Sequence, residues 1–307
     1  MSRKKWMTVA FALTLCMVMV GLLYVRPNRH GSDSFPVFLD VSSQPPSSNG
    51  YEDKPSVVNH LKNILGDDIS TAQRIQLVSS VPDDLSEIEQ QSIINFITGF
   101  PNTPGEYVVK NNLMNRLVSQ VTPLWNMSDV FIGIASDRHQ DIVIRAYAVQ
   151  HLRPLYERSR DATIRDYLYN ALFDDDTEVS GGAMLALNYL LNQDEYCSEF
   201  EREPLVQQAR KVVFDSSANN NNRITAIQIA TSYNNDPDPE LADALRLIIR
   251  DENRHSALRI SAIAGLGLIG DETDLDLLKN IAQSGKYEER AADAAIRKVL
   301  IRHGGAP

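Results

Sequence analysis

The sequence predicts an all-α protein: an α-solenoid of helical hairpins, about seven repeats long, with one N-terminal transmembrane helix. Three observations lead to this prediction. Hydrophobic residues recur with helical spacing from Ser56 onward. Related patterns return about every 35 residues, and a 20-residue stretch near the start carries no charge. No stretch shows sustained alternation of apolar and polar residues, so we expect no β-sheet.

The repeat is clearest around Arg259, which we call position zero of its repeat. The residue before it is apolar, Ala262 stands three places on and Leu266 seven places on. Related patterns occur at intervals of 30 to 43 residues, a spacing that suits one helical hairpin per repeat. The further zero positions are Arg74, Lys110, Arg145, Ser180, Arg223 and Glu289.

Two segments share a D-x-x-V/I-R/S pattern, namely Asp141–Arg145 and Asp176–Ser180, and an alanine stands three places after each. Together with LRISAIAGLGLIGD from Leu258, they resemble the HEAT-repeat family of α-solenoids over roughly residues 56–303. The resemblance implies stacked helical hairpins, but it implies no particular function.

The same resemblance implies a ladder of hydrogen bonds between the Asp and Arg residues of successive repeats. In this chain Asn219 and His255 stand where an Asp is expected, and Ser180 stands where an Arg is expected. We therefore expect the ladder to be broken.

The helices follow in order from the hydrophobic spacing, and prolines, an Asn run at 219–222 and Gly285 separate them. Pro154 is one of these expected breaks. The predicted helices cover residues 70–81, 84–99, 105–120, 125–136, 141–152, 160–173, 177–191, 200–213, 221–232, 238–250, 255–269, 273–284 and 287–301.

The uncharged stretch is Trp6–Val25. As a helix it would be about 30 Å long, enough to cross a bilayer. Three basic residues at positions 3–5 favour a cytoplasmic N-terminus. We therefore expect a single-pass protein of the cytoplasmic (inner) membrane whose solenoid is extracytoplasmic. A cleaved signal peptide, followed by export, is the alternative.

The predicted domain scheme has three parts: an N-terminal membrane anchor at 1–26 that contains the span 6–25, a Pro/Ser-rich linker at 27–55, and the solenoid at 56–307. The linker holds one apolar patch, at 35–39. The sequence leaves open whether this patch docks on the first repeat or lies at the membrane surface.

Charge argues against a nucleic-acid partner. The whole chain has a net charge of −10, and its first 30 residues carry five basic groups and no acid. The remainder therefore has 25 basic against 40 acidic residues, a balance of −15. Such a domain repels phosphate backbones unless it has a local basic patch, and the sequence shows none.

No residue pattern points to catalysis, a metal or a cofactor. Cys197 is the only cysteine outside the predicted span, and the six histidines lack zinc-ligand spacing. Acidic clusters at 174–178, 236–240 and 271–276 lack the EF-hand pattern and stand just before predicted helices. We interpret them as helix-start acids. We expect no enzyme activity.

The positions two and five residues after each zero position are uncharged, and on a helical wheel they point away from the apolar side. Amide side chains both donate and accept hydrogen bonds, so this row suits an extended peptide, as in the related armadillo repeats. A merely solvated face, or a face covered by the linker, are the alternatives. The candidate partner-binding residues are Gln76, Asn112, Asn115, Tyr147, Gln150, Thr225 and Gln228.

These observations predict a membrane-anchored scaffold or adaptor that binds a protein or peptide partner on the solenoid surface and performs no chemistry itself. The oligomeric state stays unknown. One alternative is a HEAT-like enzyme or enzyme subunit of the lyase type. Another is a purely structural spacer, which would bind no partner.

Overall fold

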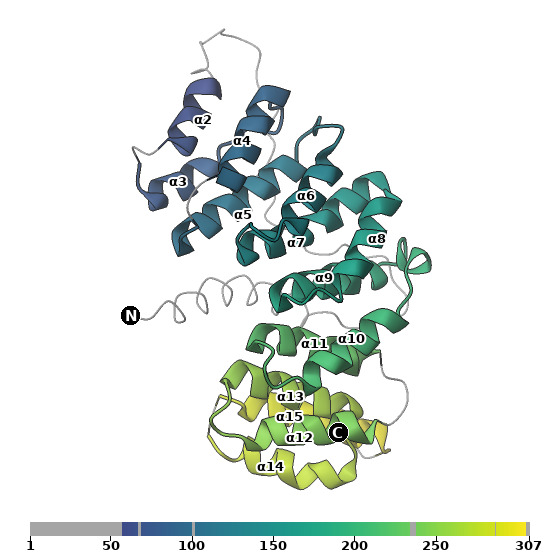
Figure 1. Ribbon diagram of the computed structural model, residues 1–307. Helices are drawn as coiled ribbons and strands as arrows, with labels where there is room; N and C mark the ends of the chain where they lie inside the picture. The colour runs from purple at the N-terminus through teal and green to yellow at the C-terminus, as the bar shows by residue number, and fades with distance from the viewer. Residues whose placement is uncertain (1–56, 67–68, 100–101, 234–237, 286, 305–307) are drawn as a thin grey trace, which may run out of the picture. The chain divides into compact units, whose positions relative to one another are not determined.

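The computed structural model describes residues 57–66, 69–99, 102–233, 238–285 and 287–304 (Figure 1). Within these ranges there are 14 α-helices, two short 3₁₀ helices and no strand, so the prediction of an all-helical fold is confirmed. The chain forms two compact units, which meet between Arg116 and Leu117.

The first unit contains α2 (Val57–Leu65), α3 (Thr71–Val78), α4 (Glu87–Gly99) and most of α5 (Pro104–Val118). The second unit contains five helical hairpins. They are α6 (Met127–Ser136) with α7 (Ile142–Ser159), α8 (Ala162–Ala171) with α9 (Thr177–Leu191), α10 (Glu203–Phe214) with α11 (Asn220–Ser232), α12 (Pro239–Arg250) with α13 (Ser256–Ile269), and α14 (Leu275–Ala282) with α15 (Glu289–Arg302).

The predicted location in the cytoplasmic membrane is corrected by this structure. Among the described residues, no helix is long and apolar enough to cross a membrane. The segment 6–25, on which that prediction rested, lies outside the described residues, as do the linker at 27–55 and its apolar patch at 35–39.

In the second unit, the second helix of each hairpin packs against the second helix of the next. Thus α7 contacts α9, α9 contacts α11, α11 contacts α13, and α13 contacts α15 (Figure 1). Gly267 shows how closely they approach, because a Cβ atom there would lie 2.7 Å from the Cα of Ala295 on α15. This stack of hairpins is the architecture of an α-solenoid.

In four of the five hairpins of the second unit, the side chain at position zero closes the hairpin. It is buried near the start of the second helix and donates a hydrogen bond to a carbonyl at the end of the first helix, whereas Glu289, the zero position on α15, is exposed. Those helix-end carbonyls lack partners within their own helix. The bonds in the second unit run from Arg145 Nε to Ala135 O (2.8 Å), from Ser180 Oγ to Leu172 O (2.6 Å), from Arg223 Nη2 to Val213 O (2.9 Å) and from Arg259 Nε to Ile249 O (3.2 Å).

Some zero positions also reach the next hairpin. Arg145 pairs with Asp176 and, at 3.2 Å, with Asp174. Arg259 pairs with Glu288 at 3.0 Å. In the first unit, Arg74 does the same, donating to Gly66 O and pairing with Glu106, both at 2.6 Å.

The ladder is broken at Ser180 and Arg223. Ser180 is too short to bridge to the next hairpin. Among the residues that the structure describes, Arg223 pairs with no carboxylate of the next repeat, and its Nε and Nη1 are buried without a hydrogen-bond partner. Its burial, followed by the nearby charge of Arg254, lowers the pKa of the Arg223 guanidinium. The expected interruption is thus confirmed, although Arg74, Arg145 and Arg259 each keep a link to the next hairpin.

Two features of the predicted helices differ from the structure. No separate helix was predicted at 57–65, where α2 lies, and α7 continues through Pro154 to Ser159. The continuation buries Leu155 and Tyr156. Their burial offsets the hydrogen bond that Pro154 cannot donate.

The longest repeat spacing, 43 residues between Ser180 and Arg223, has a structural cause. An additional segment between α9 and α10 contains the 3₁₀ helix η1 (Cys197–Glu199). Tyr156 donates a hydrogen bond to Glu199 in this segment, and the Tyr156 ring packs edge-on against Phe200 at a centroid distance of 5.0 Å. The segment is therefore anchored to α7.

Substitution of Arg145, which pairs with carboxylates of the next hairpin, should lower the free energy of unfolding more than substitution of Arg223, which does not among the described residues. Arg145→Met removes the buried one of the two arginines that pair with Asp174 and Asp176, and we expect it to lower the free energy of unfolding by about 3 kcal/mol. Arg223→Met loses one carbonyl bond but also removes two buried, unpaired N–H groups. We expect it to change stability by less than about 1 kcal/mol. Urea unfolding followed by circular dichroism measures both variants, and equal losses would contradict the assignment.

The buried hydroxyl of Tyr156 should make the stability of the fold depend on pH in the alkaline range. Burial, aided by Glu199, raises the pKa of the Tyr156 hydroxyl to about 12. The unfolded chain loses this proton near pH 10, so the hydroxyl's contribution to stability is complete below pH 10 and falls as pH rises to about 12. Tyr156→Phe lacks this contribution. The stability difference between wild type and Tyr156→Phe should therefore shrink over that range in thermal unfolding, and a constant difference would contradict this origin.

Candidate functional site

The predicted partner-binding residues divide between the two units. In the first unit Gln76 and Asn115 are exposed and Asn112 is half-buried. In the second unit Gln150 and Gln228 are half-buried. These five side chains are at least partly available to a partner, so their role stays a prediction.

For Tyr147 and Thr225, the prediction that they point away from the core is wrong. They are only 8% and 4% exposed. The second helices contact neighbours on both sides, whereas the helical wheel considered only one apolar side. Ser261, at the same repeat position, illustrates the geometry, because its hydroxyl donates to Ile224 O on the preceding α11 at 3.4 Å.

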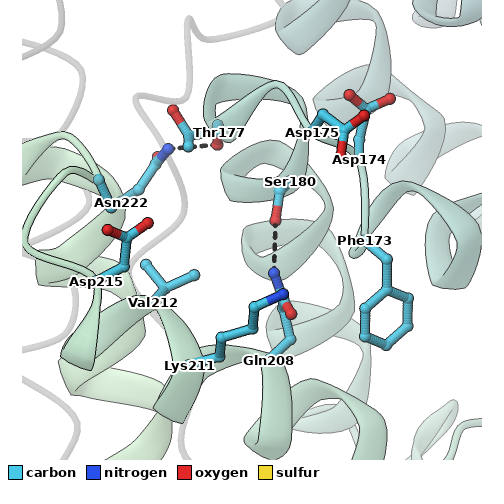
Figure 2. A pocket seen from close by; sticks show the side chains of 11 residues that line it. Phe173, Asp174, Asp175, Thr177, Ser180, Gln208, Lys211, Val212, Asp215 and Asn222 are labelled. Carbon is cyan, nitrogen blue, oxygen red and sulfur yellow. Dashed lines mark hydrogen bonds between the residues drawn. The ribbon is translucent and has the colours of Figure 1, made fainter.

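A cavity of about 200 Å³ lies between two successive hairpins, α8–α9 and α10–α11 (Figure 2). The end of α8, the start of α9, the outer side of α10 and the start of α11 form its walls. Its lining residues are Phe173, Asp174, Asp175, Thr177, Ser180, Gln208, Lys211, Val212, Asp215, Ala218 and Asn222.

The broken ladder explains why this space exists. One repeat earlier, the Arg145 guanidinium extends from position zero to the loop before the next hairpin's second helix. Ser180 has no atoms in that space, and the amide of Gln208 fills only part of it, at 3.4 Å from the Ser180 hydroxyl (Figure 2). The cavity is therefore the space that an arginine occupies in the preceding repeat.

Carboxylates dominate the charge of this cavity. Asp174 is held by Arg138 and Arg145, and Asp175 makes no hydrogen bond or ion pair within the described part of the chain. Hydrogen bonds from the hydroxyl and backbone N–H of Ser217 lower the pKa of Asp215, so Asp215 remains ionised. Against these three acids stands a single cation, Lys211.

Asp176 does not act as a simple helix-start acid, whereas Asp174 accepts from the backbone N–H of Asp176 at 2.8 Å. Asp176 is the N-cap residue of α9, but its side chain accepts no capping hydrogen bond; it binds Arg138 and Arg145 instead. By contrast, the interpretation is confirmed for Asp238, which accepts from the N–H of Leu241 at 3.0 Å.

A second, wider hollow of about 530 Å³ adjoins the first through the shared side chain of Phe173. Tyr169 lines it and is fixed by a 2.8 Å hydrogen bond from its hydroxyl to Glu201 O. The phenyl ring of Phe173 is 59% exposed. The other lining residues are Arg165, Asp166, Asn170, Glu199, Glu201 and Pro204. We call the two hollows together the Phe173 surface.

No group of three or more His, Cys, Asp and Glu side chains that could hold a metal ion occurs among the described residues. Cys197 is a free, half-buried thiol whose Sγ lies 3.5 Å from Asp194 O. His151 is buried with its ring edge-on to Phe131. Neither residue lines the Phe173 surface.

The sequence contained one signal for the Phe173 surface, namely Ser180 at a position where arginine was expected. The expected consequence was only a missing hydrogen bond. The cavity itself depends on how α10 packs beside α9, and Gln208 and Lys211 enter it from a helix that the repeat pattern did not connect with Ser180.

Comparison with known proteins agrees with the repeat architecture. The family described as HEAT repeats matches residues 203–297, from α10 into α15. The chain is also similar to deoxyhypusine hydroxylase from Saccharomyces cerevisiae, with 26% identity over 150 residues. That match covers 47% of this chain and 43% of the hydroxylase, so the chain spans less than half the length of this relative.

The matched family, the stacked hairpins and the zero-position side chains all describe one type of molecule. The match at residues 203–297 and the stacked hairpins support a HEAT-repeat family for this chain.

Proposed function

We propose that this protein is an interaction scaffold whose second unit binds a protein or peptide partner at the Phe173 surface, without a reaction of its own. One observation carries the proposal: a large aromatic side chain, 59% exposed, stands between two adjoining hollows on a rigid helical stack. Aromatic anchors beside concave polar surfaces are typical of interaction sites.

The charge of the surface favours a basic partner segment. The lining includes six acidic residues, Asp166, Asp174, Asp175, Glu199, Glu201 and Asp215, but only two basic residues, Arg165 and Lys211. Because opposite potentials attract across an interface and like charges repel, a positively charged segment is preferred over a negatively charged one.

The side chains of the surface support binding more than catalysis. Ser180 is the buried hydroxyl in the cavity, and it donates its hydrogen bond to the carbonyl of Leu172 rather than to a base. A serine nucleophile requires a neighbouring group that accepts its proton. The similar yeast protein carries the name of an enzyme. We therefore state separately, as part of the proposal, that this chain catalyses no reaction.

A peptide array tests the proposal. We expect the labelled full-length chain to capture a subset of random 12-residue peptides enriched in basic residues. Phe173→Ala should weaken capture by about tenfold, because it removes the aromatic side chain that a bound peptide would bury. Leu247→Ala is the matched control, since Leu247 is similarly exposed at 68% but lies on α12; it should leave capture unchanged.

Two results would contradict the proposal. Capture of no peptide by the wild-type chain would favour a structural spacer. Equal losses for both variants would show that the Phe173 surface is not the binding site. In that case Gln150 and Gln228, on the neutral row of the same unit, become the residues to replace with Glu.

A further inference from the structure

We propose that the cavity at Ser180 binds an arginine side chain of the partner, which occupies the space of the missing ladder arginine. This inference rests on the proposed scaffold function and assigns its specificity. In the intact repeats, a buried guanidinium bonds a helix-end carbonyl and a carboxylate of the next hairpin. At Ser180 the guanidinium is missing and Asn219 replaces the ladder carboxylate of the next hairpin, but Asp175 and Asp215 border the open space.

The size of the cavity fits a single side chain. Sites for drug-sized ligands and cofactors have volumes of about 300–1,000 Å³, whereas this cavity has about 200 Å³. The cavity is also open to solvent at Asp175 and Lys211, both exposed. A side chain can therefore enter from the surface.

The lining offers several partners to a guanidinium. Asp175 and Asp215 supply negative charge that is not taken up by an ion pair in the described part of the chain. Gln208 lines the cavity and is 7% exposed; its Nε2 donates to Ser180 Oγ at 3.4 Å, and its Oε1 is a further acceptor beside that bond. Guanidinium N–H groups form charge-assisted bonds to such oxygens.

The exposed ring of Phe173 favours arginine over lysine. Figure 2 shows this ring below Asp174, on the side of the cavity opposite Asp215. A planar guanidinium can stack on an aromatic face and bond a carboxylate at the same time, whereas an ammonium is a compact, strongly hydrated charge. Stacking of this kind already occurs in the chain, where the Arg153 guanidinium lies 3.9 Å from the Tyr189 ring centroid.

Lys211 is the one lining group that opposes a cation. Its ammonium makes no hydrogen bond or ion pair among the described residues, so it repels an incoming guanidinium. The charge of Lys211 therefore distinguishes the binding of a cation from the binding of an anion. Removing the charge of Lys211 should strengthen arginine binding, whereas it should weaken binding of any anion that used Lys211.

The test uses the full-length chain and three dye-labelled nine-residue peptides of glycine and serine, whose central residue is arginine, lysine or citrulline. Fluorescence polarisation measures their affinity. We expect the arginine peptide to bind at least about tenfold more tightly than the citrulline peptide, which has the same shape without the charge. The lysine peptide should be intermediate.

Variants of the lining then locate the site. Asp175→Asn should weaken binding of the arginine peptide by about tenfold, and Lys211→Gln should strengthen this binding by several fold. Ser180→Arg should fill the cavity and abolish binding. Since Ser180→Arg could also perturb folding, the two exposed substitutions carry the test by themselves. Glu252→Gln, exposed in the loop after α12, is the control and should have no effect.

Three outcomes would overturn the inference: equal binding of the arginine and citrulline peptides, no binding of any of the three, or weaker arginine binding after Lys211→Gln. If random peptides are captured at Phe173 but arginine is not required, the scaffold function stands and only the assigned specificity is wrong.

Discussion

Four hairpins of the second unit carry a buried polar side chain near the start of the second helix. This side chain has two tasks. It bonds a carbonyl at the end of the preceding helix, which closes its own hairpin, and, where it is an arginine with a carboxylate opposite, it also joins the next hairpin. Arg145 and Arg259 perform both tasks. Ser180 and Arg223 perform only the first. The polar links between repeats are therefore unequal, although their helix packing is continuous.

The missing ion pair at Ser180 explains where the cavity forms. A buried arginine that lacks its carboxylate, as at Arg223, leaves unpaired N–H groups, which lower stability. A serine in the same position avoids that penalty, because its small hydroxyl is satisfied by Leu172 O. The consequence of the serine is empty space between α9 and α10, bordered by acids. The serine thus removes the contact between two repeats and creates the cavity at the same time.

Much of the fold was predictable because the repeat is carried by large, regularly spaced apolar residues. The long interval before Arg223 corresponds to the additional segment that contains η1, although that segment was not predicted. The burial of Tyr147 and Thr225 was not predictable from one helix at a time, since it arises from helices of two neighbouring repeats. The continuation of α7 beyond Pro154 was missed for a similar reason, because it depends on tertiary burial of Tyr156. Local rules describe each helix well, but the candidate site is created between helices.

We expect zero-position ion pairs to determine which hairpins unfold as cooperative units. Hydrogen exchange of the full-length chain, followed by mass spectrometry at low urea concentrations, measures this. Helices α7 and α9 should become exchangeable together, and α13 and α15 in a separate step, with the boundaries at α9–α11 and α11–α13, where the ladder is broken. A single step for all five hairpins, or a boundary between α7 and α9, would contradict this expectation.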